Sequence, residues 1–186
     1  MITPNDFRRG LTFRRNGDLF RVLEFLHVKP GKGPAFVRAK IQNLRSGSIN
    51  EVTFRTEEKL EGVRVERREM VYLYREGDML VFMDNETYDQ MSVPEEVIGE
   101  KVKLIKENDP VFLEMYESEI LGVDLPAAVV LRVMHAEPGV RGDTATSATK
   151  PAELETGLVV QVPLFVNEGD LIKVDTRTCQ YIERAK

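Results

Sequence analysis

The chain has 186 residues, of which 42% are hydrophobic and 31% are charged, and its formal net charge is −5. This length accommodates one large domain or two to three small ones, and no apolar run approaches the roughly 20 residues of a membrane-spanning helix. The start, MITPNDFRRG, lacks the apolar core of a signal peptide, and the single cysteine, Cys179, excludes an internal disulfide framework. We therefore expect a cytoplasmic protein that does not enter a membrane.

The net charge hides an uneven distribution along the chain. Residues 1–64 carry 13 Lys and Arg against 7 Asp and Glu, residues 65–128 carry 6 against 16, and residues 129–186 carry 7 against 8. A basic first third can meet phosphates, whereas an acidic middle third cannot lie flat on them. Such asymmetry indicates an interaction surface.

The stretch VKPGKGPAF, residues 28–36, predicts a hairpin tip with Lys32 at its apex. Glycine permits the positive φ angles of tight turns, proline fixes φ near −65°, and the residues that follow alternate between apolar and polar, as a half-buried strand does. Taken alone, a lysine in a hairpin is usually just solvated. Four residues would shape its loop: Pro30, Gly31, Gly33 and Pro34.

Nearly every other readable segment has the pattern of a strand bounded by turn residues. The clearest helix signal is the capping-box pattern Ser92-Val93-Pro94-Glu95, which predicts a helix over residues 95–98 that Gly99 ends. The predicted strands beyond the hairpin are Val71–Tyr74, Met79–Met83, Val111–Met115, Val129–Val133, Leu158–Val162 and Leu171–Asp175.

A recurring turn divides the chain into units of similar size. Gly-Asp precedes a strand at residues 17–18, 77–78 and 169–170, and the last two copies are followed by similar hairpin turns that begin at Asp84 and Asp175. The spacing predicts three β units, the last two of one kind. We expect an all-β protein of three small barrels in series, over residues 1–64, 65–128 and 129–186.

No constellation of catalytic residues is evident. The two histidines, His27 and His135, are far apart in sequence, and no metal-ligand spacing occurs. Gly31-Lys32-Gly33 lacks the spacing and the following helix of a phosphate-binding P-loop. The sequence therefore indicates a binding protein, with no enzymatic activity, no metal and no cofactor.

Several motifs resemble those of the bacterial elongation factor P family, over the whole chain. One is the lysine-tipped hairpin. The second, KPAELETGLVVQVPLFVNEG at residues 150–169, fits the family signature of Lys-x-Ala, then Gly, Val-Pro and Gly at every fixed position. PGVRGDTAT at residues 138–146 and YIER at residues 181–184 are also similar to family motifs.

The resemblance implies both a fold and a function. The fold would be a KOW-type, SH3-like barrel followed by two OB-fold domains, in an elongated, L-shaped monomer that mimics tRNA. Such a translation elongation factor binds the ribosome between the peptidyl and exit sites. There it stimulates peptide-bond formation and relieves stalling at consecutive prolines by positioning the peptidyl-tRNA.

The resemblance also implies partners and contact residues. The hairpin with Lys32 would reach the peptidyl-transferase centre, and the partners would be ribosomal RNA, peptidyl-site tRNA and messenger RNA. Arg8 and Arg9 belong to the basic first third and are candidates for RNA contact. The other candidates are Gly142, Asp143 and Thr144 near messenger RNA, and Tyr181 and Arg184 against tRNA.

Two alternatives stay open at this point. In many family members a modifying enzyme extends the tip residue, whereas others keep an unmodified lysine in a proline-flanked loop. The PGKGP palindrome around Lys32 is similar to the second group, so we expect an unmodified tip, with the modified state as the alternative. The alternative function is a free-standing OB-fold module that binds single-stranded RNA.

Overall fold

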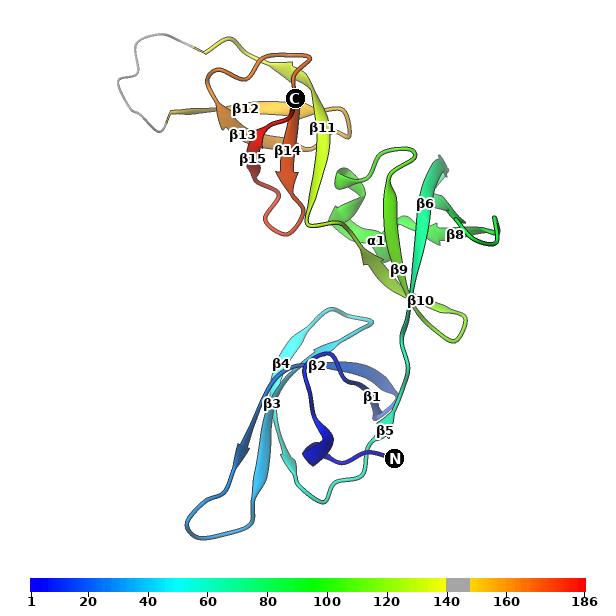
Figure 1. Ribbon diagram of the computed structural model, residues 1–186, viewed down its shortest axis with the longest axis vertical. Helices are drawn as coiled ribbons and strands as arrows, with labels where there is room; N and C mark the ends of the chain where they lie inside the picture. The colour runs from blue at the N-terminus through cyan, green and yellow to red at the C-terminus, as the bar shows by residue number, and fades with distance from the viewer. Residues whose placement is uncertain (140–147) are drawn as a thin grey trace. The chain divides into compact units, whose positions relative to one another are not determined.

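A computed structural model describes residues 1–139 and 148–186 of the chain, and nearly all of its regular structure is β (Figure 1). This confirms the all-β prediction. The chain divides into two compact units, residues 1–67 with 114–122 and residues 68–113 with 123–186. In the described residues no helix has the length and apolar character needed to cross a membrane.

The first sheet has five antiparallel strands in the order β4-β3-β2-β1-β5. Their bounds are β1 Thr12–Arg15, β2 Asp18–Val28, β3 Phe36–Asn43, β4 Ile49–Arg55 and β5 Glu61–Gly62. Alternate side chains of these strands face an aromatic core in which Phe7, Phe13 and Phe54 are at most 4% exposed. Their ring centroids lie 5.2–6.0 Å apart, distances at which aromatic pairs attract.

The other two sheets share one strand order. The second is β10-β9-β6-β7-β8, and the third, written in the reverse direction, is β15-β14-β11-β12-β13. In each sheet the first strand in sequence, β6 or β11, lies between the second (β7 or β12) and the fourth (β9 or β14). The second sheet contains β6 Glu66–Glu76, β7 Met79–Asp84, β8 Gln90–Pro94, β9 Pro110–Tyr116 and β10 Glu119–Asp124. The third contains β11 Ala128–Ala136, β12 Thr149–Leu154, β13 Val159–Pro163, β14 Leu171–Asp175 and β15 Tyr181–Arg184.

The two hairpin turns that look alike in sequence are also alike in structure. Asp84 Oδ1 accepts hydrogen bonds from the backbone N–H groups two and three residues later, and Asp175 Oδ1 does the same. Each turn closes with a non-glycine residue at positive φ, which is Tyr88 (φ 61°) in the first turn and Cys179 (φ 57°) in the second. These bonds hold the pKa of both carboxyls below the ordinary 3.8, because they favour the charged form.

The short helix α1 spans Glu95–Ile98 and ends at Gly99 with φ 66°, as predicted. Its capping box, however, was predicted wrongly. Ser92 belongs to β8, and Pro94 occupies the N-cap position without a side-chain cap. Ser92 pairs with Val81 of the neighbouring strand. Because Ser92 is held in the sheet by this pairing, it does not cap the helix as its local sequence predicted.

The 3₁₀ helix η2, Gly99–Leu104, follows α1 directly and contributes to the core of the third sheet. Leu104 is 1% exposed and packs in one cluster with residues of β11, β12, β13 and β14. The Thr156 hydroxyl, between β12 and β13, donates a hydrogen bond of 2.5 Å to the Lys103 carbonyl. Within the second unit, therefore, one turn of the middle segment is built into the packing of the C-terminal sheet.

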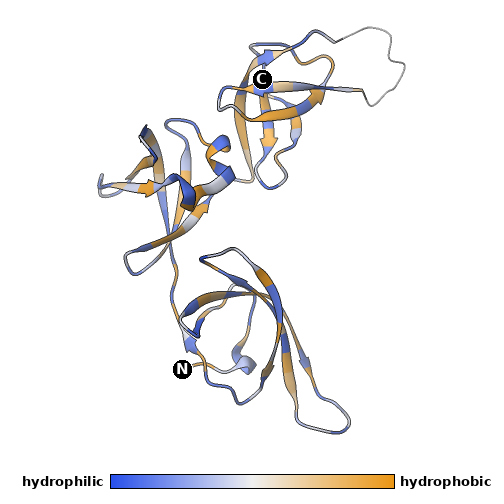
Figure 2. Ribbon diagram, turned by 180° about the vertical axis from the view of Figure 1, so that it is seen from behind, coloured by the Kyte–Doolittle hydropathy of each residue, from blue (hydrophilic) through white to orange (hydrophobic). Residues whose placement is uncertain are grey.

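Hydrophobic segments alternate with hydrophilic ones along most strands (Figure 2). In β3 the buried residues are Val37, Ala39 and Ile41, while the intervening Arg38 and Lys40 are exposed. The period of two predicted for this strand is therefore confirmed, and it places one face of β3 in the core.

Candidate nucleic-acid interface

The hairpin formed by β2 and β3 carries Lys32 in the loop at its end. The last paired residues are Val28 and Phe36, so residues 29–35 form the connection. Gly33 has φ 105°, a backbone conformation that other residues rarely adopt. An added Cβ at Gly31 or Gly33 would meet no atom within 4 Å. Glycine is needed at position 33 for its backbone conformation. The tip is narrow because neither Gly31 nor Gly33 carries a side chain.

The Lys32 side chain is exposed, and no described residue forms an ion pair or a hydrogen bond with it. The whole connection from Lys29 to Pro34 is exposed as well. A lysine ammonium is a compact, strongly hydrated charge on a long flexible stem with three donors. Here all three donors are available to an outside acceptor, such as a phosphate or hydroxyl oxygen.

The outer half of this hairpin stands apart from the aromatic core. From Glu24 to His27, β2 is exposed, although its first residues pack into the sheet. The change follows a register shift between Val22 and Glu24, and a β-bulge of this kind bends a strand. The rings of Phe25 and His27 meet edge to face at 5.7 Å. The strand pairing and this ring contact both stiffen the arm that carries the lysine.

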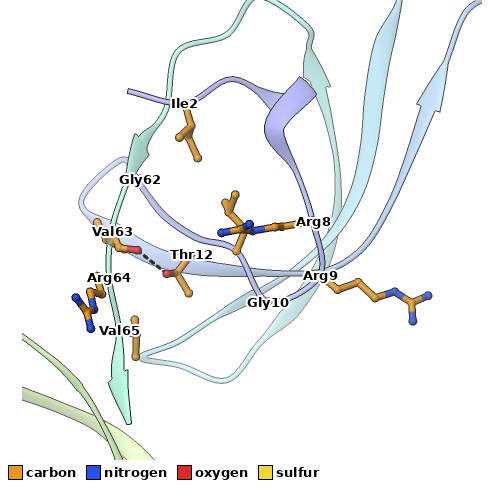
Figure 3. A pocket seen from close by; sticks show the side chains of 10 residues that line it. Ile2, Arg8, Arg9, Gly10, Thr12, Gly62, Val63, Arg64 and Val65 are labelled. Atoms are coloured by element: carbon orange, nitrogen blue, oxygen red, sulfur yellow. Dashed lines mark hydrogen bonds between the residues drawn. The ribbon is translucent and has the colours of Figure 1, made fainter.

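Arg8 and Arg9 lie on the rim of an open hollow of about 480 Å³ in the first unit. Residues 8–12 form one side and residues 62–65 the other, together with Ile2; we call it the arginine hollow (Figure 3). Both arginine side chains are exposed. Arg64 also lines the hollow but was not selected from the sequence. Its position at the predicted junction after the first sheet could have indicated it.

The C-terminal candidates lie on the edge strand β15. Tyr181 is half-buried and packs against the core of the third sheet, so its side chain contributes to the packing of that sheet. Arg184 is exposed, and its guanidinium lies 5.5 Å from the centroid of the Phe165 ring and 3.8 Å from Asp170. Phe165 is 58% exposed and was not singled out from the sequence. Only the signature segment VPLFV pointed to it.

Not every candidate can be placed. Gly142, Asp143 and Thr144 lie outside the described residues. Lys32, Arg8 and Arg9 belong to the first unit, whereas Tyr181 and Arg184 belong to the second. Outside residues 140–147, no three His, Cys, Asp or Glu side chains gather as a metal site would require.

Comparison with known proteins covers the chain from end to end. Three family models match: "Elongation factor P (EF-P) KOW-like domain" over residues 3–60, "Elongation factor P (EF-P) OB domain" over 65–123, and "Elongation factor P, C-terminal" over 129–184. Elongation factor P from Moorella thermoacetica is 53% identical, and that from Desulfitobacterium hafniense 54% identical, over 185 residues and 100% of both chains. The chain belongs to the elongation factor P family.

Solved structures agree with this assignment at the level of the fold. Eukaryotic translation initiation factor 5A from Methanococcus jannaschii aligns with 66% of this chain and 94% of its own, at a TM-score of 0.50 and 22% identity. A translation initiation factor eif-5a family protein from Naegleria fowleri aligns at a TM-score of 0.52 and 16% identity. The predicted order of a KOW-like domain followed by OB domains is confirmed, and the chain is a translation elongation factor.

Proposed function

We propose that this member of the elongation factor P family binds the ribosome between the peptidyl and exit sites and speeds peptide-bond formation there. Its main task would be to relieve stalling at consecutive prolines by positioning the peptidyl-tRNA. The observation that carries the proposal is the exposed Lys32 on a stiff, narrow hairpin, in a chain whose full length matches the family. Its place of action would be the cytoplasm, and its working form a monomer.

The proposed mechanism needs no acid, base or metal from the protein. Proline reacts slowly because its ring constrains the geometry of both donor and acceptor. Holding two reactants in a productive arrangement lowers the barrier without any new chemical group. The Lys32 ammonium would donate hydrogen bonds to the anionic backbone at the acceptor end of the tRNA. Charge-assisted bonds of this kind are stronger than neutral ones.

The rest of the chain would supply affinity and placement. The net positive charge of residues 1–64 suits a phosphate-rich environment, with ribosomal RNA and peptidyl-site tRNA as partners. Arg184, oriented by Phe165, would contact the tRNA body, and residues 142–144 would approach messenger RNA. We also propose domain boundaries near residues 64 and 128, which fall in or beside the gaps between the matched family ranges.

The state of Lys32 is part of the proposal. The exposed tip leaves its ammonium accessible to a modifying enzyme, but two prolines already limit the entropy that the loop loses on docking. We propose that the lysine acts unmodified. Intact-mass measurement of the protein purified from its own source tests this directly, since any added group raises the mass above that of the sequence.

Binding to ribosomes separates this function from its alternative, a free-standing module for single-stranded RNA. We expect the protein to sediment with ribosomes that carry a peptidyl-tRNA in the peptidyl site and to bind single-stranded RNA weakly. Among the described residues, the exposed aromatics are Phe25, Tyr74, Tyr88 and Phe165, which are too few for a stacking platform of several bases. Tight binding to free single-stranded RNA, with no co-sedimentation, would favour the alternative.

A further inference from the structure

The arginine hollow holds a group of cations that the hairpin mechanism does not use. We infer that it binds the phosphodiester backbone of an RNA, without reading its sequence, through Arg8, Arg9 and Arg64. The inference rests on the proposed function, because RNA is the polyanion that a ribosome-bound factor meets. It adds a second contact region to the first unit and assigns Arg64 a role.

The three arginines differ from most others in residues 1–64 because no described carboxylate pairs with them. A guanidinium without a neighbouring carboxylate keeps its attraction for an outside anion. The paired arginines are Arg14 with Glu61 at 3.6 Å, Arg15 with Glu58 at 3.3 Å, Arg21 with Glu114 at 3.0 Å, Arg38 with Glu51 at 3.5 Å and Arg45 with Glu119 at 2.8 Å.

Backbone hydrogen bonds fix both sides of the hollow. On one side, Phe7 is buried directly before Arg8, and the Gly10 N–H donates to the Val22 carbonyl at 2.8 Å. On the other, the Val63 N–H donates to the Thr12 carbonyl at 3.0 Å, and the Thr12 hydroxyl donates to the Val63 carbonyl at 2.6 Å. The cations are therefore anchored on ordered backbone, which lowers the entropy lost on binding.

The directions of the side chains favour an extended polyanion over a single small anion. Figure 3 shows Arg8 reaching across the hollow toward Gly62 and Val63, while Arg9 points away on one side and Arg64 on the other. A lone phosphate would need donors that converge on it. Guanidinium groups spread across an open surface can instead meet successive phosphates of one strand.

The lining of the hollow also favours contact with the backbone over contact with bases. Its residues include no aromatic side chain on which a base could stack. Arginine and lysine contacts to phosphates position a nucleic acid but carry no sequence information. Binding should therefore be independent of RNA sequence and strongly dependent on salt.

The test is the salt dependence of binding to a fluorescein-labelled RNA hairpin, followed by fluorescence anisotropy across a series of KCl concentrations. Arg8→Gln and Arg64→Gln should each reduce the slope of log K against log salt by about 1, as the loss of one phosphate contact does. The matched control is Arg55→Gln, which removes an exposed arginine from β4 that does not line the hollow. Its slope should equal that of the wild type.

Charge-retaining variants exclude a merely structural role. Arg8→Lys and Arg64→Lys keep the cation and should restore the slope, although affinity falls somewhat because lysine lacks the bidentate fork of arginine. Thermal unfolding of every variant checks that the fold is intact. Polyglutamate serves as a competitor, and we expect it to displace the hairpin poorly.

Four outcomes would overturn the inference. They are no binding of the hairpin to the wild type, an unchanged slope in Arg8→Gln and Arg64→Gln, an equal loss in Arg55→Gln, and displacement by polyglutamate as effective as by unlabelled RNA. The proposed function is judged separately, by translation of a Pro-Pro-Pro reporter. If the wild-type protein does not relieve stalling but the arginine hollow binds RNA, the proposed function fails and the inference about the hollow stands. If the wild-type protein relieves stalling but Arg8→Gln and Arg64→Gln bind RNA as the wild type does, the inference fails and the proposed function stands.

Discussion

Lys32 and Lys29 lie in the same exposed loop and each carries one positive charge, but only Lys32 lies at the tip of the loop. We expect Lys32→Ala to bind ribosomes nearly as well as the wild type, because one of several charge contacts is lost, yet to fail at consecutive prolines. A tenfold loss of rate would correspond to about 1.4 kcal/mol of transition-state stabilisation, a reasonable size for one charge-assisted hydrogen bond. Single-turnover peptide-bond formation at saturating protein measures it.

The matched control for this variant is Lys29→Ala, which removes the same charge from the base of the same loop. It should keep most of the wild-type rate. Equal losses in Lys29→Ala and Lys32→Ala would show that the loop acts through its overall charge and not through its tip residue.

Pro34 lets the contribution of loop stiffness be measured separately from that of the cation. Pro34→Ala keeps Lys32 but widens the conformations open to the unbound loop. We expect a rate between those of the wild type and Lys32→Ala, with the loss recovered in part at high protein concentration. A rate equal to the wild type at every concentration would mean that the loop is ordered by its site and not by its sequence.

The carboxylates of Asp84 and Asp175 make stability depend on pH. Backbone hydrogen bonds hold the folded pKa of each below the ordinary 3.8. Each group therefore stabilises the fold at pH values above about 4, and its contribution is lost as the pH falls through the lower folded pKa. Asp84→Asn and Asp175→Asn should lower the Tm at neutral pH and flatten its decline in acid.

Thermal unfolding followed by circular dichroism over a pH series measures this effect. Glu86→Gln is a control in the same turn, because only its backbone N–H takes part in the bonds of the turn. If Asp84→Asn and Asp175→Asn lost Tm in acid as steeply as the wild type does, other carboxylates would be responsible.

Single residues differ in how well the sequence predicted them. The turn at Lys32 could be found because glycine and proline constrain the backbone locally. Arg64 and Phe165 were missed, since their environments depend on chain segments distant in sequence, Arg8–Thr12 for one and Arg184 for the other. Tyr181 was selected from the sequence as an RNA contact, but its packing against the core of the third sheet could not be predicted from the YIER motif alone.

The strands were predicted well, because alternation and turn residues are local signals. The prediction that residues 65–128 and 129–186 fold alike is confirmed by the strand order that the second and third sheets share, but the hairpin turns used to reach it do not correspond. Asp84 lies between the second and third strands of its sheet, whereas Asp175 lies between the fourth and fifth. The same turn chemistry serves two different positions, so similarity in sequence here reflects turn geometry and not a repeated place in the fold.

Leu104 gives a test at the level of the element η2. Leu104→Ala should reduce stability by about 2–5 kcal/mol, because it leaves a cavity in a well-packed cluster. Urea unfolding measures the loss, and hydrogen exchange locates it, since the amides of Leu131 and Ile172 should exchange faster. Val102→Ala, at a half-buried position of the same turn, should have a smaller effect. Unchanged exchange in β11 and β14 would contradict the packing role assigned to Leu104.

Over the whole chain, the distribution of charge is consistent with the proposed function. The first third carries an excess of six positive charges and the middle third an excess of ten negative charges, so only part of the chain can approach phosphates closely. Elongation factor P relatives match over the full length, and the proposed catalysis by positioning needs no reactive side chain. The affinity would come from the basic surface, and the effect on rate from the hairpin.

The central claim is that this chain speeds peptide-bond formation at consecutive prolines. The most direct test is the rate at which ribosomes translate a Pro-Pro-Pro reporter, with and without saturating protein, beside an otherwise identical reporter that lacks prolines. We predict faster passage through the proline run when the protein is present and little change on the control reporter. An unchanged rate at the prolines, with ribosome binding verified in the same sample, would contradict the claim.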